Sequence, residues 1–498
     1  MAPLSKAGAA LAALRAGLTG AVFTPDDPGY DEARTIFNAM IDRRPAVIAR
    51  CESEADVTRA VRFARDLDLP IAVRGGGHSV AGMSLNDGGL VVDLSRMHEV
   101  TVHPGSETVR VGGGALMTHL DRATEPYGLA TTGGRASTTG VGGYVLGGGT
   151  GWLDRSLGLA VDNLLGVELV TADGTPVRAT DQENPELFWA LHGGGGNFGV
   201  ATALTLKLHP LPEFSMALVM YLPDSGPDVV RVYREIIENG PPEASGGVLY
   251  LTAPPEEFVP GHLVGTRLCG ALVAYAGGED DMRKIAQPLL ALPHEVEIVT
   301  ALPYADLQCM IDDPPGWRNY WSAEYLTGAP DDFVDVFCAL GDAMPVPTGT
   351  QHVLFPQGGA IASGPTRWPV PYRDAPWAVH PFGIWEDPAD DERCVDWVRK
   401  VREDVRPWST GAVYLNFIGD EGTDRVRAGL GEDNLRRLAA VKAEYDPDNV
   451  FRFNHNIPPG PGRRLTPGHS SRHVPRTAPA VSPVARHDPE MPPEAVRG

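Results

Sequence analysis

The chain has 498 residues, more than one hydrophobic core usually supports, so we expect two domains or one large split domain. Hydrophobic residues make up 43% of it and charged residues 21%, as in ordinary soluble globular proteins. The formal net charge of -22 at pH 7 argues against nucleic acids and anionic membrane surfaces as partners. Because the sequence has no run of about 18 apolar residues, no membrane-spanning helix is expected.

The cysteine pattern indicates a reducing environment. The chain contains five cysteines that lie far apart and form no CxxC pair: Cys51, Cys269, Cys309, Cys338 and Cys394. Such a set is typical of neither a disulfide framework nor a metal centre, so we expect no metal site and a cytoplasmic location. The apolar N-terminal stretch, residues 1–23, is interrupted by Arg15 and has leucines at helical spacing. It therefore predicts a short amphipathic helix and not a signal peptide.

Residues 31–210 alternate between helical patterns and short β-branched runs. Periodicity predicts helices over residues 56–68 and 118–127, the first with Val57 and Val61 on its apolar face. Strands are predicted over residues 71–73, 90–94, 109–111, 164–171 and 200–208.

A second pattern begins near residue 215, after Leu211 and Pro212, with longer strands of antiparallel type and acidic amphipathic helices. The strands are expected over residues 216–222, 247–252 and 268–275, and the helices over 281–292 and 390–406. A further helix is predicted over 432–445. From Pro458 on, ten prolines, six arginines and no aromatic residue predict disorder, because such a segment cannot bury a core.

Glycine is concentrated in four segments, most of them beside predicted strands: residues 75–77, 112–114, 133–151 and 193–199. Glycine permits positive φ and close approach of a ligand to the backbone, and consecutive N–H groups in such loops converge on an anion. Four segments of this kind suggest a long ligand such as a dinucleotide. None of them fits GxGxxG at the opening of a βαβ unit with an acidic residue about 20 positions later, which disfavours a Rossmann fold.

Several motifs occur in a specific order along the chain. They are RGGGHS at 74–79, GVGGxxxGGGxG at 140–151, GLxxDN at 158–163, LFWALHGGGGNFGV at 187–200 and YDPDNVFRFNHNI at 445–457. In content and order they resemble the berberine bridge enzyme-like FAD-linked oxidases, which belong to the vanillyl-alcohol-oxidase (PCMH-type) flavoprotein group. The resemblance extends over about residues 20–460.

This resemblance implies an α+β fold built from two regions of the chain. Residues 1–210 would form a PCMH-type FAD-binding domain, and residues 211–413 an inserted substrate-binding domain of antiparallel sheet covered by helices. Residues 414–460 would return to the FAD domain as the berberine-like segment, and residues 461–498 would be a disordered tail.

The resemblance also implies how FAD is held. The histidine of RGGGHS is joined to the 8α position of the flavin in the family, which indicates His78 here. Many members add a second bond from a cysteine four residues before GVGG, where this chain has Ala136. We therefore expect a singly linked flavin, as in the bacterial branch typified by 6-hydroxy-D-nicotine oxidase.

Further cofactor contacts follow from the same motifs. Around the pyrophosphate the resemblance implies Arg74, Gly75, Gly76, Gly77, Ser79, Gly82, Thr138, Thr139, Gly140, Gly142 and Gly143. For the ribityl, ribose or adenine parts it implies Asp162, Asn163 and Val200, and for the flavin ring Asn416 and Asn454.

The family's chemistry implies oxidation of a C–OH, C–N or activated C–H bond of a small organic substrate by hydride transfer to flavin N5, with O2 as electron acceptor. A secondary-metabolite substrate is consistent with the family. Two alternatives stay open at this point: a flavin dehydrogenase with another acceptor, and a flavoprotein whose cavity binds or rearranges a product without net redox chemistry.

Candidate catalytic residues are few. Relatives have tyrosines where this chain has Thr150 and Phe417, so Tyr414, Tyr144 and His352 remain as candidates. The run WRNYW at 317–321 resembles a family element at the cavity wall. Strand alternation places His352, Leu354 and Pro356 on one face and Val353, Phe355 and Gln357 on the other, without indicating which face is inward.

Overall fold

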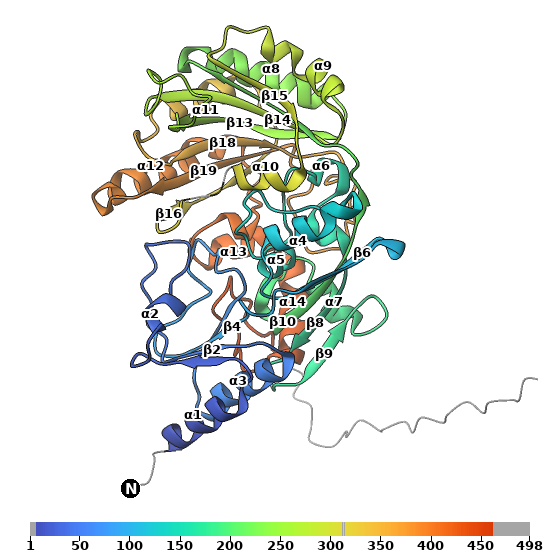
Figure 1. Ribbon diagram of the computed structural model, residues 1–498, viewed down its shortest axis with the longest axis vertical. Coiled ribbons are helices and arrows are strands. Elements are labelled where there is room, and N and C mark those ends of the chain that lie inside the picture. Colours follow the sequence, from blue (N-terminus) through green and yellow to red (C-terminus); the bar gives the residue numbers. More distant parts are fainter. Residues whose placement is uncertain (1–5, 311, 313, 462–498) are drawn as a thin grey trace, which may run out of the picture. The chain divides into compact units, whose positions relative to one another are not determined.

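Three large β-sheets and their helices make up the described part of the computed structural model, residues 6–310, 312 and 314–461 (Figure 1). The expectation of a disordered tail over 461–498 therefore falls, except for Pro461, on residues outside the described part. None of the helices in the described ranges is both long and apolar enough to cross a membrane.

A four-stranded sheet near the N-terminus has the order β1-β2-β4-β3. Its strands are β1 (Ala21–Phe23), β2 (Val47–Arg50), β3 (Ile71–Arg74) and β4 (Leu90–Asp93), and its helices are α1 (Lys6–Gly17), α2 (Tyr30–Ala33) and α3 (Glu54–Asp66). β2 and β3 run parallel to β4. The hydroxyl of Ser53 caps α3 by accepting from the amide of Asp56, and Val57 and Val61 pack into the core beneath the sheet. This core fixes β3, from whose end the RGGGHS loop leaves.

A five-stranded antiparallel sheet has the order β5-β6-β10-β8-β9. Its strands are β5 (Val100–His103), β6 (Thr108–Gly112), β8 (Leu164–Val170), β9 (Pro176–Ala179) and β10 (Val200–Lys207), and a small pair is formed by β7 (Leu129–Ala130) and β11 (His209–Pro210). The helices of this region are α4 (Met117–Thr124), α5 (Val141–Leu146), α6 (Asp154–Leu157) and α7 (Pro185–Ala190). The helix predicted over 118–127 changes to a 3₁₀ turn at Glu125–Tyr127, where Pro126 lacks an N–H.

The C-terminal region returns to these elements. Helices α13 (Thr423–Leu430) and α14 (Glu432–Tyr445) contact each other, and α14 contacts α7. The closing segment then packs Phe451 against the core below the four-stranded sheet.

An eight-stranded antiparallel sheet is formed by the part of the sequence that follows β11 and precedes α13. Its strands are β12 (Ser215–Tyr221), β13 (Ala244–Thr252), β14 (Arg267–Tyr275), β15 (Val296–Ala301), β16 (Arg318–Trp321), β17 (Glu324–Leu326), β18 (Gln351–Pro356) and β19 (Trp377–Trp385). Its helices are α8 (Gly226–Asn239), α9 (Glu279–Leu290), α10 (Tyr304–Met310), α11 (Asp331–Asp342) and α12 (Asp391–Asp404). Figure 1 shows α8, α9 and α11 on one side of this sheet, where their contacts with the strands place them.

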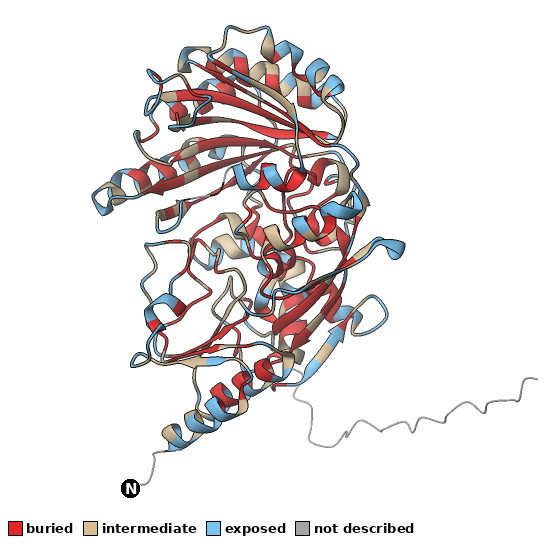
Figure 2. Cartoon of the chain, in the orientation of Figure 1, coloured by how far each residue is buried: buried red, intermediate tan, exposed pale blue. Residues whose placement is uncertain are grey.

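Alternation along the strands separates the two faces of this sheet. Tyr250 and Leu354 point under the helices and pack with Phe337 into one apolar core. Figure 2 shows the result: the strands are buried, while the covering helices are buried on one side and exposed on the other. The opposite face of the sheet is free to form the wall of a cavity.

Candidate active site

A cavity of about 360 Å3 lies between the glycine-rich loops and the uncovered face of the eight-stranded sheet. The loops contribute Gly75 to Ser79, Thr139, Gly140, Gly142, Gly143 and the segment from Gly193 to Asn197. The sheet contributes alternating residues of β13, β18 and β19, namely Gly247, Leu249, Gln351, Val353, Phe355, Phe382 and Ile384, together with Leu272 of β14 and Trp321 of β16. Tyr414 to Ile418 and the closing segment, with Phe451 and Phe453 to His455, complete the lining. Four regions far apart in the sequence therefore meet at one cavity.

Two glycine loops touch backbone to backbone in this lining. A Cβ added to Gly76 would lie 2.5 Å from the backbone N and Cα of Gly140, and Gly77 has a φ of 71°. Only glycine satisfies both demands without displacing the neighbouring loop. The glycines thus bring main-chain atoms, and not side chains, to the cavity surface.

The same loop presents free N–H groups. For the backbone amides of residues 76–79, the structure shows no protein acceptor within the described residues. Buried backbone amides normally have a partner, and consecutive unpaired ones form a cradle for an anion. The loop therefore fits the pyrophosphate of FAD, the cofactor that the resemblance implies.

His78 faces the cavity from the end of this cradle. Its ring stacks on Phe37, with centroids 4.2 Å apart, and its Nε2 lies 3.3 Å from the hydroxyl oxygen of Thr138. Loss of solvation lowers the pKa of His78 to about 4, so the imidazole is neutral at pH 7 and one ring nitrogen keeps its lone pair. Ala136 also lines the cavity, without a thiol at that position.

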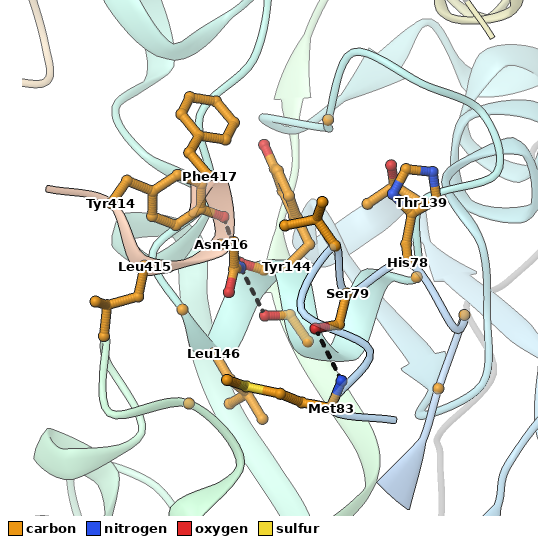
Figure 3. Close-up of a pocket in the computed structure, with 18 of the residues that line it drawn as sticks. His78, Ser79, Met83, Thr139, Tyr144, Leu146, Tyr414, Leu415, Asn416 and Phe417 are labelled. Carbon is orange, nitrogen blue, oxygen red and sulfur yellow. Dashed lines mark hydrogen bonds between the residues drawn. The ribbon is translucent and has the colours of Figure 1, made fainter. Parts of the chain in front are cut away.

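Tyr414 and Asn416 form a hydrogen-bonded group on another wall (Figure 3). The Tyr414 hydroxyl accepts from the amide of Gly149 at 3.2 Å and from Asn416 Nδ2 at 2.8 Å. It donates to the carbonyl of Tyr144 at 3.3 Å. Burial raises the pKa of Tyr414 and, more strongly, that of Tyr144, so both phenols are protonated at neutral pH. The two N–H donors and Arg135 oppose this rise at Tyr414, but burial is the larger effect and keeps the oriented phenol protonated.

Aromatic rings form the wall on the sheet side. Trp321, Phe355, Phe382 and Phe417 all line the cavity. His380 stacks behind Phe382, with centroids 3.6 Å apart, and burial lowers the pKa of its imidazole. Such a wall suits a flat organic molecule, and Trp321 comes from the WRNYW run identified in the sequence.

The structure brings many of the predicted site residues to this cavity. Those in the lining are Gly75, Gly76, Gly77, His78, Ser79, Thr139, Gly140, Gly142, Gly143, Tyr144, Tyr414, Asn416 and Asn454. Those outside it are Arg74, Gly82, Thr138, Asp162, Asn163, Val200 and His352.

Most of the residues outside the lining have protein partners of their own. Asp162 forms an ion pair with Arg373, with Nη1 of Arg373 2.9 Å from Oδ2. Asn163 donates to the carbonyls of Leu157 and Leu159. These bonds join parts of the chain to one another, and they occupy the polar atoms that the sequence analysis assigned to FAD.

The structure does not bring His352 to the cavity. Its neighbours Gln351 and Val353 line the cavity, and the two-residue alternation turns His352 toward the helices. There its ring stacks on Phe337 with centroids 4.1 Å apart, and burial lowers its pKa to about 3. A neutral imidazole in an apolar core has no route to a substrate in the cavity.

Several lining residues were not among the predicted ones. The glycine-rich segment 193–199 is expected from its composition to contact a dinucleotide, but none of its residues is named individually as a site residue. Arg135 gave no such signal, because a single arginine within a glycine-rich segment has no distinctive spacing.

Two family models match parts of the chain, and known proteins resemble it over most of its length. A model described as FAD binding domain matches residues 45–180, and one described as berberine and berberine like matches residues 413–458. The (R)-6-hydroxynicotine oxidase of Paenarthrobacter nicotinovorans is 32% identical over 456 residues, covering 89% of this chain and 97% of that protein. An uncharacterized FAD-linked oxidoreductase of Bacillus subtilis (strain 168), YgaK, is 29% identical over 467 residues, with 89% and 97% covered.

Solved structures share the fold. The crystal structure of 6-hydroxy-D-nicotine oxidase from Arthrobacter nicotinovorans has a TM-score of 0.79 at 28% identity, covering 89% of this chain and 98% of that one. Physcomitrella patens BBE-like 1 has a TM-score of 0.80 at 23% identity, covering 91% and 99%, which shows the fold alone. The predicted α+β fold of the PCMH type is confirmed.

Proposed function

The chain belongs to the berberine bridge enzyme-like family of FAD-linked oxidoreductases, and we propose that it is an oxidase holding FAD through one covalent bond, to His78. The observation that supports this most directly is the neutral imidazole of His78 at the end of the glycine cradle. Because Ala136 stands in the lining without a thiol, a second bond has no donor at that position.

The protein's part in the reaction is to hold and enclose the reactants. The amides of residues 76–79 bind the pyrophosphate, and the glycines around Gly140 and Gly194 allow the cofactor to lie against the backbone. Bound FAD would supply the redox chemistry, namely a two-electron acceptor for a hydride of the substrate that could be reoxidised by O2 with release of hydrogen peroxide. The aromatic wall orients a small organic substrate and excludes water.

The protonated Tyr414 indicates which substrates suit the site. Oxidation of an alcohol requires a base that takes the hydroxyl proton, and burial keeps the Tyr414 phenol in its acid form. A neutral amine needs no such base to give its hydride. Within the range of C–OH, C–N and activated C–H bonds, the site therefore favours a C–N bond.

The proposed division of the chain into domains follows from assigning the glycine loops to FAD and the aromatic wall to the substrate. Residues 1–210 and 414–460 would hold FAD, and residues 211–413 would supply the wall that faces the substrate, as the lining by strands β13, β18 and β19 suggests. A cytoplasmic location agrees with five cysteines that are all unpaired.

The mass of the intact denatured protein tests the covalent bond. We expect the wild type to gain the mass of one FAD and His78→Ala to gain none, because only a covalent cofactor survives denaturation. His352→Leu, a histidine outside the cavity, is the matched control and should keep the gain.

Other outcomes separate the remaining possibilities. An equal gain in His78→Ala would show another attachment site, and protein that is colourless before denaturation would contradict flavin binding altogether. Anaerobic bleaching by a substrate followed by slow recovery in air would identify a dehydrogenase instead of an oxidase. If no substrate bleaches the flavin, the cavity serves binding without redox chemistry.

A further inference from the structure

Arg135 is the only residue with a formal charge at pH 7 among the described residues that line the cavity. The remaining lining consists of glycine, apolar, aromatic, hydroxyl and amide residues, with His78 and His455, whose pKa values burial lowers to about 4. The Arg135 side chain is 9% exposed. A buried cation is costly unless a carboxylate or a ligand compensates it, and the carboxylate that pairs with Arg135, that of Asp154, lies outside the cavity lining.

Two aromatic rings hold the guanidinium in place on the substrate side. Its Cζ lies 4.1 Å from the ring centroid of Phe355, on β18, and 5.1 Å from that of Trp152. Both rings also line the cavity. Cation–π contacts of this kind hold the guanidinium and exclude water beside the two rings, so its N–H groups are left for polar contacts elsewhere.

The protein uses only part of that edge. Nη2 donates to the carbonyl of Gly151 at 2.9 Å, and Nη1 lies at the limit of hydrogen bonding from the hydroxyl of Thr150, at 3.5 Å. Nε has no partner in the described part of the chain. Since a guanidinium has five N–H donors, each terminal nitrogen keeps one hydrogen for a further acceptor.

Asp154 balances the charge without occupying these donors. Its carboxylate lies 3.6 Å from Nη2 of Arg135, and its Oδ2 accepts from the amide of Gly151 at 2.9 Å and from the hydroxyl of Thr150. Burial raises the pKa of Asp154, and Arg135 opposes the rise. The Asp154 carboxylate is thus outside the cavity lining, whereas Arg135 belongs to it.

We propose that Arg135 is a specificity-determining residue that binds a carboxylate of the substrate through its two terminal nitrogens. The planar fork of arginine matches the two oxygens of a carboxylate, and this pairing is strong where water is excluded. The proposal rests on the proposed function, because it takes the wall at Phe355 as the substrate side. It narrows the substrates to small, flat organic acids.

The position of Arg135 argues against a role in holding the cofactor's phosphates. The cradle of free amides is formed by residues 76–79, whereas Arg135 is enclosed by Trp152 and by Phe355 of the sheet. A cationic group of the substrate would be repelled at the same place.

Benzoate and benzamide, which have the same shape and differ in charge, are the probes. Their binding to the purified flavin-containing full chain is measured by calorimetry and by the change in flavin absorption. In the wild type, benzoate should bind more tightly than benzamide. In Arg135→Met benzoate affinity should fall roughly 10- to 100-fold, as expected for hydrogen bonds to a charged group, while benzamide affinity stays unchanged. Arg135→Lys should recover only part of the loss.

A charge-matched control is Arg399→Met on α12, because the Arg399 side chain is 63% exposed and is not part of the cavity lining. It should bind both probes as the wild type does. The proposal is overturned if flavin-containing wild type binds the two probes equally or binds neither, or if Arg135→Met weakens both alike. It is also overturned if Arg135→Met releases the flavin, which would assign Arg135 to the cofactor. A wild type without flavin would instead contradict the proposed function.

Discussion

Burial sets the protonation state of individual histidines in this protein. Solvent exclusion lowers the pKa of His192 to about 4 and that of His352 to about 3. In each case the folded value lies below the ordinary value of about 6.5, so the unfolded chain binds more protons than the folded chain between these limits. The free energy of unfolding should therefore fall as the pH decreases from about 6.5 toward 4, and be insensitive to these groups above that range.

His352→Leu isolates one of these contributions. Its two ring nitrogens have no side-chain partner in the described residues, so leucine replaces an unpaired imidazole in an apolar core. When the pH falls from 7 to 5, the free energy of unfolding should decrease in both proteins, but by about 1–2 kcal/mol less in the variant than in the wild type. Urea denaturation at each pH measures this difference. Anaerobic flavin reduction should stay near the wild-type rate. Parallel pH curves would contradict burial as the cause, and loss of reduction would return His352 to the catalytic candidates.

At the scale of elements, the closing segment is held by a buried ion pair. Lys442 on α14 and Asp446 are both fully buried, and the Lys442 ammonium also donates to the carbonyls of Asn197 at 2.7 Å and Phe451 at 2.9 Å. Asp446 accepts from the amides of Val450 and Phe451. Because Asn197 lines the cavity, this network joins α14 to the cavity wall.

Lys442→Met should lower the unfolding free energy by about 3–5 kcal/mol, because it leaves the buried Asp446 carboxylate without its cation. Denaturant titration followed by tryptophan fluorescence measures the loss. Arg436→Met, on the same helix but with a side chain that is 76% exposed, is the control and should change stability little. Equal stability of both variants would show that the buried pair does not hold the segment.

At the scale of the whole described chain, long-range polar contacts join the glycine-rich region to the segment that contains the eight-stranded sheet. Asp162 pairs with Arg373, 211 residues further along, and both side chains are less than a tenth exposed. Arg155 on α6 donates to the carbonyls of Ala244 at 2.8 Å and Ile237 at 3.2 Å. These contacts join the two stretches of chain that supply the opposite walls of the cavity.

Arg373→Met should destabilise the protein by about 3 kcal/mol or more, since it strands the Asp162 carboxylate. Adding Asp162→Asn should recover part of that loss, because the stranded charge is then removed. Thermal unfolding of the two variants, with covalent flavin content measured in parallel, tests this expectation. If Asp162→Asn alone retained full stability but lost flavin, Asp162 would contact the cofactor as the sequence analysis expected.

Local patterns were sufficient for much of the fold and for one end of the site. The helix at α3 and the strand at β3 follow from periodicity, and the loop from Gly75 to Ser79 follows from glycine's tolerance of positive φ. These features depend on neighbours in the chain, which the sequence displays directly.

Other features depend on partners that are distant in the sequence. Alternation along β18 divided its side chains into two sets, but only the helices that cover the sheet decide that Val353 faces the cavity and His352 the core. From the sequence alone, Asp162 cannot be distinguished from an acidic residue that binds a ligand. Its ion pair with Arg373 is visible only in the folded chain. Arg135 becomes distinctive only when folding surrounds it with Trp152 and Phe355. The amino-acid order thus determines backbone conformation and the glycine cradle, whereas burial and charge pairing, which set the chemistry of the walls, arise from tertiary contacts alone.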